Sequence, residues 1–389
     1  GYETALGAAL VALSLEQDPF GGGIGACSRG EGVPLHAGPA EDLGGAALGA
    51  AGVRPAAQAE ELSVVGLVEI LSPRPRIHGV YRRMLAAARQ LRPAAAILTD
   101  SSGFHLRLAP RLRALGVPVF YLVAPQAWAW REGRVRNLRR NVMELFCIFP
   151  FEEDWFRKRG VTATYIGHPL AEEARPGRSR EDFFARHRLP PGRPLVTLCP
   201  GSRPGEVFRH LPVLEGAMAL LAQTAACSFA LALPAGAGWV ASPEVSSFVR
   251  RTGAFLVEGE TWDALAHADA ALPASGTVAL EAALLGVPMA VYYRVQPLTY
   301  WLGRPFVKTP FFSMVNLIAG APVVEELIQA RCTPEELARA AAALLQDEEL
   351  KTRMRAQLAG VAAALRTGRD PLDLAAGRVA ASLEEIGVK

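Results

Sequence analysis

The stretch LVTLCPGSRPGEV, residues 195–207, decides the fold. Leu195 to Cys199 is an apolar run that reads as a buried strand, and a helix follows the turn Pro200-Gly201-Ser202-Arg203. Such a turn offers backbone N–H donors, a hydroxyl and a guanidinium at the carboxyl end of a strand. It predicts a pyrophosphate site; the alternative is a tight strand-to-helix turn with a solvated arginine.

The same alternation of strands and helices extends on both sides of this stretch. We expect further strands over residues 94–100, 117–123, 143–149, 162–166, 229–233, 254–257, 268–272 and 289–293. Strands separated by longer helical segments predict parallel βαβ units and an α/β fold. A polar stretch with Pro and Gly, residues 172–180, interrupts the pattern.

We therefore expect two Rossmann-like domains, over residues 1–172 and 173–389, that face each other across a cleft. The tail over residues 333–385 has helical spacing and predicts terminal helices within the second domain. Residues 20–52 are rich in Gly and Ala with little periodicity, which predicts a loop or an insertion.

Composition excludes several classes of function. The chain has 389 residues, 50% of them hydrophobic, which is enough for two buried cores. A net charge of +3 is too small to indicate a nucleic-acid partner. The 5 cysteines include no CxxC pair, which argues against a disulfide framework or a zinc site and favours a reducing compartment. The apolar run Thr4 to Leu15 reaches about half of the ~20 residues that a bilayer-spanning helix needs, so we expect neither a membrane span nor a signal peptide.

A second polar loop lies at residues 272–281, LPASGTVALE. Ser275, Gly276 and Thr277 open a helix whose N-terminus suits a phosphate. Glu281, one turn further on, could accept hydrogen bonds from ribose hydroxyls; the alternative is an acid that only favours the helix dipole. Both loops follow strands of a parallel sheet, and ligands of such sheets bind at the carboxyl ends of the strands.

Together the two loops resemble the nucleotide half of GT-B glycosyltransferases, which are built from two Rossmann-like domains. The resemblance becomes narrower at residues 121–131, YLVAPQAWAWR, which are similar to the Tyr-Val-Ser-Pro-x-x-Trp-Ala-Trp-Arg segment of lipid-A-disaccharide synthases. Residues 61–69, 149–152, 166–169, 200–203, 274–277 and 316–320 match the same family in order. From about Glu60 onward the chain resembles that family.

The resemblance implies an inverting hexosyltransferase. Its donor would be UDP-2,3-diacylglucosamine and its acceptor the 6-hydroxyl of 2,3-diacylglucosamine 1-phosphate, giving the β(1→6)-linked lipid A disaccharide and UDP. No cofactor and no metal are expected. The family works peripherally on the cytoplasmic face of the inner membrane, and the terminal helices permit a homodimer.

The resemblance also assigns candidate residues. Asp100, at the end of a predicted strand, matches the first Asp of the family's Ile-Asp-x-Pro-Asp-Phe-Asn segment and is the candidate base; the alternative is a helix cap. Arg203 would neutralise the charge that grows on the departing UDP. Tyr293, Arg294 and Asn316 match donor-side positions, although an arginine after a strand is often only solvated.

Other candidates belong to the acceptor or membrane side. The basic segment over residues 64–85, with Arg82 and Arg83, suits an anionic bilayer surface or an acyl-chain entrance; the alternative is an amphipathic helix on the core. Beside Trp128 and Trp130 lies a second basic cluster, which either receives the acceptor phosphate or anionic head groups or is a solvated helical face. Its members are Arg131, Arg134, Arg136, Arg139 and Arg140. His168 either orients a substrate or belongs to a structural turn.

The chain departs from the family pattern in three places. The family's first strand and its Gly-Glu-x-Ser-Gly-Asp loop have no counterpart, and we expect Tyr2 to Leu15 to be the helix that follows them. Gly103 and His105 stand where the family has Asp and Asn, so acceptor recognition could differ. The alternatives are another UDP-sugar glycosyltransferase or a UDP-N-acetylglucosamine epimerase of the same fold, or an inactive remnant that binds nucleotide or lipid.

Overall fold

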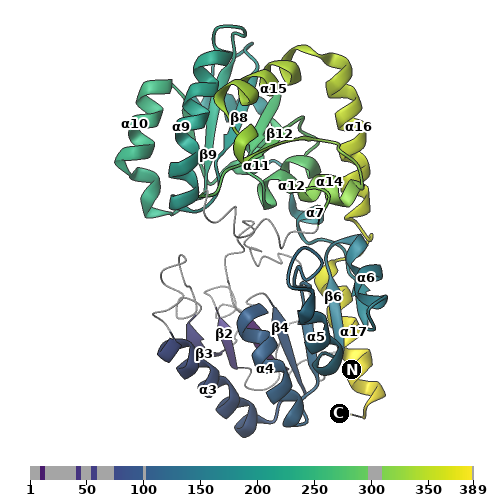
Figure 1. Ribbon diagram of the computed structural model, residues 1–389. Coiled ribbons are helices and arrows are strands. Elements are labelled where there is room, and N and C mark those ends of the chain that lie inside the picture. Colours follow the sequence, from purple (N-terminus) through teal and green to yellow (C-terminus); the bar gives the residue numbers. More distant parts are fainter. Residues whose placement is uncertain are drawn as a thin grey trace. The chain divides into compact units, whose positions relative to one another are not determined.

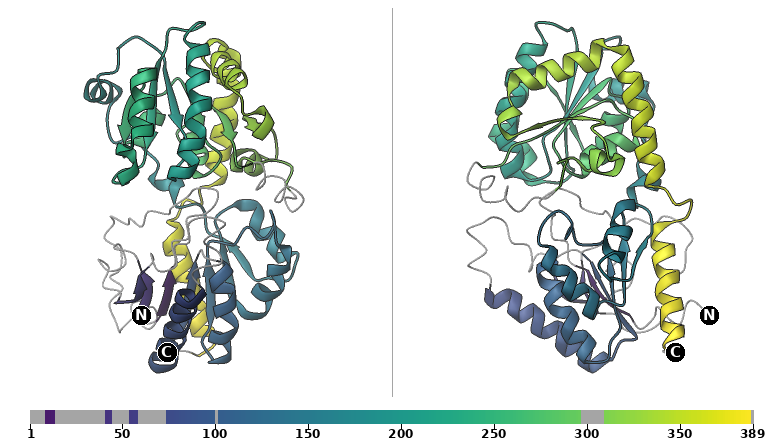
Figure 2. Two further views of the ribbon diagram at one scale, coloured as in Figure 1. Left: turned by 60° about the vertical axis from the view of Figure 1, so that its left-hand side comes forward. Right: turned by 45° about the vertical axis from the view of Figure 1, so that its right-hand side comes forward.

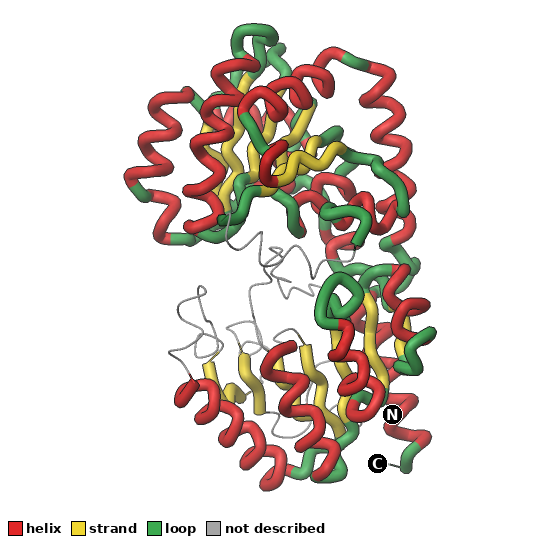
Figure 3. The backbone as a smooth tube through the Cα atoms, viewed as in Figure 1, coloured by secondary structure: helices red, strands yellow, loops and turns green. Residues whose placement is uncertain are grey.

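The computed structural model describes residues 9–13, 41–44, 54–58, 74–99, 102–296 and 309–387. These residues form two compact units, each built around a parallel sheet with helices against it (Figure 1). The first unit contains the described residues up to Pro169 together with those from Leu365 onward, and the second contains Leu170–Ala364. Figure 3 shows the alternation of strands and helices in both units.

The main sheet of the first unit joins strands in the order β1-β4-β5-β6-β7, all parallel. These strands are β1 (Ala9–Leu13), β4 (Ala95–Thr99), β5 (Val119–Leu122), β6 (Glu144–Cys147) and β7 (Ala163–Tyr165). Strands β2 (Glu41–Gly44) and β3 (Arg54–Gln58) pair separately. The helices are α3 (Arg74–Leu91), α4 (Ser102–Ala114), α5 (Val135–Asn141), α6 (Pro150–Arg157) and α17 (Pro371–Glu385).

The second unit has the strand order of a dinucleotide-binding fold. Strands β8 (Leu195–Cys199), β9 (Ser228–Leu233), β10 (Phe255–Glu258) and β11 (Ala270–Pro273) form a parallel sheet in the order β10-β9-β8-β11. Two bridges, Ala271 to Met289 and Ala274 to Tyr292, add the parallel pair of β12 (Ala290–Tyr293) and β13 (Glu325–Ile328) beyond β11. The chain therefore moves outward on one side of β8 and returns to build the other side, which creates a switch point between β8 and β11.

The remaining helices belong to the second unit. They are α7 (Leu170–Glu173), α8 (Arg180–His187), α9 (Pro204–Leu221), α10 (Pro243–Thr252), α11 (Thr261–Ala266), α12 (Thr277–Leu284), α14 (Met314–Ala319), α15 (Pro334–Gln346) and α16 (Glu348–Ala364). Every residue of β8, β9 and β11 is buried, as expected for strands with helices on both faces. No helix in the part of the chain that the structure describes is long and apolar enough to cross a membrane.

The N-terminal segment differs from our expectation. Residues 9–13 form the edge strand β1 beside β4, where we had expected a helix over Tyr2 to Leu15. Pairing with β4 satisfies backbone groups that would otherwise be exposed along the edge of β4. Residues 41–44 likewise form β2, so at least these four residues of the expected 20–52 loop are a strand; the rest of that range lies outside the described residues.

The division of the chain also differs from the expected one. The chain passes from the first unit to the second between Pro169 and Leu170, three residues before the expected boundary at 172. Helix α17 belongs to the first unit and not to the second (Figure 2). The physical reason is a buried carboxylate on β6. Glu144 is 2% exposed, and its Oε1 lies 2.9 Å from Nη2 of Arg378 on α17. Ser382, also on α17, donates to Oε2 of the same carboxylate.

Candidate functional site

The two polar loops identified in the sequence lie side by side at the switch point of the second unit. One follows β8 and the other follows β11, its parallel neighbour. The Ala274 N–H donates to the Cys199 carbonyl at 2.8 Å, and the Ser275 N–H donates to the Tyr292 carbonyl at 2.8 Å. These bonds fix the second loop between the ends of β8 and β12. Ligands of doubly wound sheets bind at this position.

The loop of residues 200–203 is already occupied by a carboxylate from its own chain. Arg203 caps α9, Pro204 is the first helical residue, and Glu206 in the first turn turns back over the loop. The Ser202 and Arg203 N–H groups donate to Glu206, and the Tyr293 hydroxyl also hydrogen-bonds with it. The loop N–H groups expected to bind a pyrophosphate therefore hold this side chain.

Gly201 is required by this arrangement. Its φ is 120°, and a Cβ at this position would lie 2.2 Å from Oε2 of Glu206. Burial raises the pKa of Glu206, while the Tyr293 hydroxyl and Arg203 oppose that rise. Arg203 is half-buried beside the carboxylate, so the structure brings a cation, an anion and a phenol together at the end of β8.

The loop of residues 275–277 leads into the N-terminus of α12, at the same edge of the sheet as the 200–203 loop, and leaves that N-terminus without a side-chain cap. Gly276 is the N-cap of α12 and provides no side-chain cap, and Thr277 is the first helical residue. The first N–H groups of a helix have no acceptor within the helix, and the helix dipole favours an anion beside them. Ser275 is buried at 4% exposure, while Thr277 is half-buried. The end of α12 therefore suits a phosphate better than the 200–203 loop does.

Glu281 lies one turn into α12. Burial raises the pKa of its carboxyl to about 7, and a hydrogen bond from the Trp262 side chain on α11 opposes that rise. A carboxylate has several acceptor sites, so an ionised Glu281 can accept from Trp262 and from a ligand hydroxyl at the same time. This residue has the position and the acceptor capacity expected for a ribose contact.

Tyr293 and Arg294 leave β12 beside these loops. The Tyr293 side chain is buried and contacts Glu206, whereas the Arg294 side chain is exposed. The backbone of Arg294 is fastened on both sides: its N–H donates to His210 Nε2 at 3.2 Å, and its carbonyl accepts from Arg209 Nη1 at 3.5 Å. The two residues therefore lie beside the 200–203 loop, and their assignment to the donor side stays a prediction.

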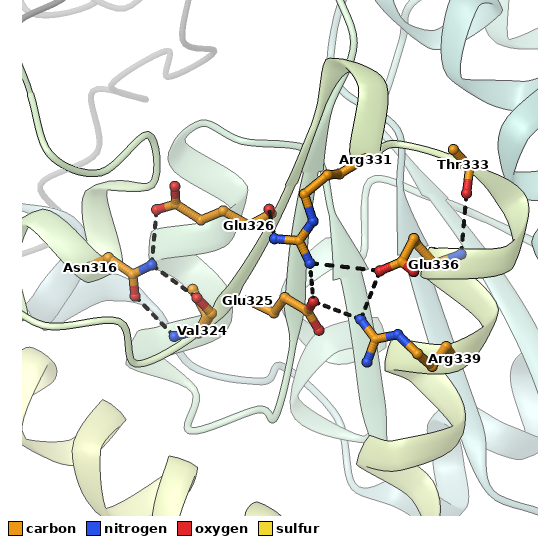
Figure 4. A network of polar contacts seen from close by, with 8 residues as sticks. All are labelled: Asn316, Val324, Glu325, Glu326, Arg331, Thr333, Glu336 and Arg339. Atoms are coloured by element: carbon orange, nitrogen blue, oxygen red, sulfur yellow. Dashed lines mark hydrogen bonds and ion pairs between the residues drawn. The ribbon is translucent and has the colours of Figure 1, made fainter.

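Asn316 has a different environment from the other donor-side candidates (Figure 4). Its Nδ2 donates to the Val324 carbonyl at 2.9 Å and to Glu326 Oε1 at 2.8 Å, and its Oδ1 accepts from the Val324 N–H at 2.9 Å. Its side chain is 1% exposed. These bonds tie α14 to β13, which indicates a role in the architecture of this segment.

In the first unit, Asp100 lies outside the described residues. Its neighbours in the chain are described: Thr99 ends β4, and Ser102 begins α4. Arg134 Nη1 donates to Ser102 Oγ at 2.7 Å, so a guanidinium reaches the first residue of α4. The guanidinium carbon of Arg134 lies 5.3 Å from the centroid of the Trp130 ring, and that of Arg131 lies 4.5 Å from it.

Arg131 is exposed, whereas Trp130 is half-buried. It has a φ of 59° and a ψ of 46°, a left-handed conformation that is uncommon for a residue with a side chain. Trp130, Arg131, Arg134 and Ser102 form a set that we call the Trp130 cluster. It combines two cations with a ring surface, which is a suitable surface for a phosphate on a partly apolar ligand.

Trp128 and His168 contribute to the core of the first unit. Trp128 Nε1 donates to Glu152 Oε1 at 2.8 Å, and Phe149 N–H donates to Glu152 Oε2 at 3.2 Å. Burial raises the pKa of Glu152 to about 8 and lowers that of His168 to about 4. The ring of His168 lies 5.4 Å from that of Phe149. Three of the quoted sequence segments thus meet in one buried cluster.

The basic segment of residues 64–85 is described from Arg74 onward, as helix α3. Val80, Met84 and Ala88 are buried on one face, while Arg82 and Arg83 are exposed on the other. This is the amphipathic helix given above as the alternative. The segment over residues 61–69 lies outside the described residues.

Sequence reasoning missed four members of these sites: Glu206, His210, Trp262 and Ser102. Glu206 had a recognisable signal, because an acid in the first turn after a polar cap is a capping-box pattern. His210 had a weaker one: residues 207, 210, 211 and 214 share the buried face of α9, and a histidine there reads as core.

Known proteins resemble this chain over most of its length. A family model described as Lipid-A-disaccharide synthetase matches residues 41–370. The lipid-A-disaccharide synthase of Solibacter usitatus (strain Ellin6076) is 51% identical over 347 residues, covering 88% of this chain and 88% of that protein. The enzyme of the same name from Myxococcus xanthus (strain DK1622) is 43% identical over 299 residues, covering 76% of this chain and 77% of that protein.

Solved structures share the fold at low identity. The UDP-GlcNAc 2-epimerase from Neisseria meningitidis, solved with UDP-GlcNAc bound, has a TM-score of 0.54 at 11% identity and covers 84% of this chain and 89% of its own. A calicheamicin glycosyltransferase has a TM-score of 0.50 at 16% identity, covering 90% and 92% of the two chains. These likenesses confirm the expected α/β fold of the GT-B type.

Proposed function

The chain belongs to the lipid-A-disaccharide synthase family of glycosyltransferases, and on this premise we propose that it transfers 2,3-diacylglucosamine from UDP-2,3-diacylglucosamine to 2,3-diacylglucosamine 1-phosphate. The products are the β(1→6)-linked disaccharide 1-phosphate and UDP. The observation that carries the proposal is the meeting of Arg203, the open end of α12 and Glu281 at one switch point. Membership of the family supports a UDP-sugar as the donor, and the acyl groups on that sugar are part of the proposal.

The donor end of the reaction needs stabilisation of a departing diphosphate. As the bond between the sugar and the β-phosphate breaks, negative charge grows on the phosphate oxygens. The N-terminus of α12 and the Arg203 guanidinium are fixed positive groups suited to that charge. Glu281 would accept hydrogen bonds from the ribose and so orient the nucleotide.

Glu206 adds a condition to donor binding. Its carboxyl group accepts hydrogen bonds from the loop N–H groups and lies near Arg203, so these donors are already engaged on this side of the site. The diphosphate therefore belongs toward α12, with Arg203 between the diphosphate and Glu206. This placement leaves the Glu206 contacts intact and gives the guanidinium a partner on each side.

The acceptor end of the reaction needs a base and a phosphate site. Asp100 is the proposed base for the 6-hydroxyl of the acceptor, on the strength of the family resemblance. We assign the acceptor phosphate to the Trp130 cluster, because Arg134 joins Trp130 to the first residue of α4. Arg82 and Arg83, exposed on α3, are the proposed contacts to the anionic cytoplasmic face of the inner membrane.

The test is acceptor-dependent release of UDP by the purified chain. We expect UDP and disaccharide only when both acylated substrates are present, with the disaccharide identified by mass spectrometry. Glu281→Gln should weaken the reaction, whereas Glu258→Gln, an exposed acid at the end of β10, serves as the matched control. UDP binding without disaccharide would indicate a nucleotide-binding remnant, and release of UDP without the acceptor would indicate a different UDP-sugar reaction.

A further inference from the structure

His210 is a polar side chain on the apolar face of α9. It is 0% exposed, like the neighbouring core residue Val207 on the same helix. Its ring packs against two tyrosine rings, with centroids 5.0 Å from Tyr292 and 5.6 Å from Tyr293. A phenylalanine would fill this space without burying polar atoms. The histidine must therefore be accounted for by its hydrogen bonds.

Both ring nitrogens of His210 contact backbone groups. Nδ1 lies 2.7 Å from the Pro200 carbonyl, and Nε2 accepts from the Arg294 N–H at 3.2 Å. A carbonyl can only accept and a backbone N–H can only donate, so the hydrogen of the neutral ring is on Nδ1 and the lone pair is on Nε2. Protonation of Nε2 would abolish the bond to Arg294. Burial lowers the pKa of His210 to about 4, so the ring is neutral at ordinary pH.

The two backbone groups come from strands that do not pair with each other. Pro200 follows β8, and Arg294 follows β12, while β11 lies between these strands. The sheet ladder connects their ends only through β11, whereas His210 connects them directly. The adjacent Arg209 side chain also donates to the Arg294 carbonyl, at 3.5 Å. One turn of α9 therefore fixes the exit of β12 against the loop that carries Arg203.

We propose that His210 is a positioning residue that holds the Arg203 loop and the Arg294 segment in register, so that both guanidinium groups can meet the diphosphate of a nucleotide-sugar donor. This inference rests on the proposed function and adds a residue that acts through the backbone of two others. His210 contacts neither substrate nor reacting atom in it. The ring acts as a rigid link, because each nitrogen has one acceptable partner and the tyrosine rings prevent rotation.

Three variants separate the two hydrogen bonds. His210→Asn places an amide N–H near Nδ1 and keeps the bond to Pro200, while His210→Gln places an acceptor near Nε2 and keeps the bond to Arg294. His210→Phe fills the space and keeps neither. We expect the dissociation constant for UDP to rise roughly tenfold for each lost bond, equivalent to about 1.4 kcal/mol, and most in the Phe variant. The KM for the acceptor should change less than about twofold.

The matched control is Leu214→Val, one turn further along the same buried face of α9. It should lower the melting temperature without changing the UDP dissociation constant. Ring-nitrogen NMR of the wild type should show hydrogen on Nδ1 only. The inference is overturned if His210→Phe binds UDP within twofold of the wild type. It is also overturned if Leu214→Val, with the same melting temperature as His210→Phe, weakens UDP binding as much as His210→Phe does. A wild-type chain that neither binds UDP nor turns over would instead overturn the proposed function.

Discussion

Raising the pH from about 6 to about 8 should strengthen binding of a UDP-sugar about tenfold, because Glu281 must be ionised to accept two ribose hydrogen bonds. The pKa of the buried carboxyl is about 7, so about one tenth of the protein carries the ionised form at pH 6 and about nine tenths at pH 8. The apparent dissociation constant scales inversely with the competent fraction, which gives the factor of about ten.

The assay is calorimetry with UDP-N-acetylglucosamine, whose pyrophosphate diester does not titrate in this range. Binding at about pH 6 should also release a proton, which is visible as a dependence of the heat on the buffer. Two variants fix the assignment. Glu281→Gln should bind weakly with no pH dependence, and Trp262→Phe, which removes the hydrogen bond that lowers the pKa of Glu281, should move the midpoint to higher pH.

The reasoning would be refuted by a wild-type dissociation constant that stays constant within twofold across this range. It would equally be refuted if Glu281→Gln kept the wild-type pH dependence, since another group would then be titrating. A midpoint that moved to lower pH in Trp262→Phe would contradict the assigned role of the indole N–H.

Three further predictions address other parts of the chain. Arg203→Lys keeps the charge but loses the planar fork, so kcat should fall by about tenfold or more while the acceptor KM is unchanged in steady-state assays. Burial raises the pKa of Glu152 above its ordinary value of 4.5 to about 8, so wild-type stability should fall as pH rises from about 4.5 to about 8. The decline is at most about 5 kcal/mol, at about 1.4 kcal/mol per pH unit, and urea unfolding of Glu152→Gln should not show it. Glu144→Gln on β6 should lower stability by about 1.5–3 kcal/mol and expose α17 to proteolysis. Glu384→Gln, an exposed position on α17 itself, is the control.

Much of the fold could be predicted from the sequence because the strands are short, apolar and separated by helical segments. Each expected strand from residue 94 to residue 293 overlaps an observed one, and β8 has the expected bounds, Leu195–Cys199. The two polar loops of the second unit could also be placed, since polar residues that follow neighbouring parallel strands must meet at one edge. Local pattern was sufficient for these features.

The parts that could not be predicted depend on contacts between distant residues. Glu144 reads as a polar residue at the start of a strand, and its burial is explained by distant partners: Thr164 on β7, and Arg378 and Ser382 on α17, 234 and 238 residues later. His210 reads as a core residue until Pro200 and Arg294 are seen on its two nitrogens. The edge strand β1 reads as a helix because Ala and Leu favour helices locally, whereas pairing with β4 decides its state.

The position of α17 has a consequence for biosynthesis. The described residues of the second unit all lie within Leu170–Ala364, so a ribosome releases this whole stretch before it makes α17. The first unit begins earlier but contains α17, which is synthesised after the second unit, and the buried carboxylate of Glu144 has no guanidinium from Arg378 until then. We therefore expect the order of maturation to be the reverse of the order of translation, with the second unit folded first. A chain that stopped near residue 364 would keep that half and lose the other.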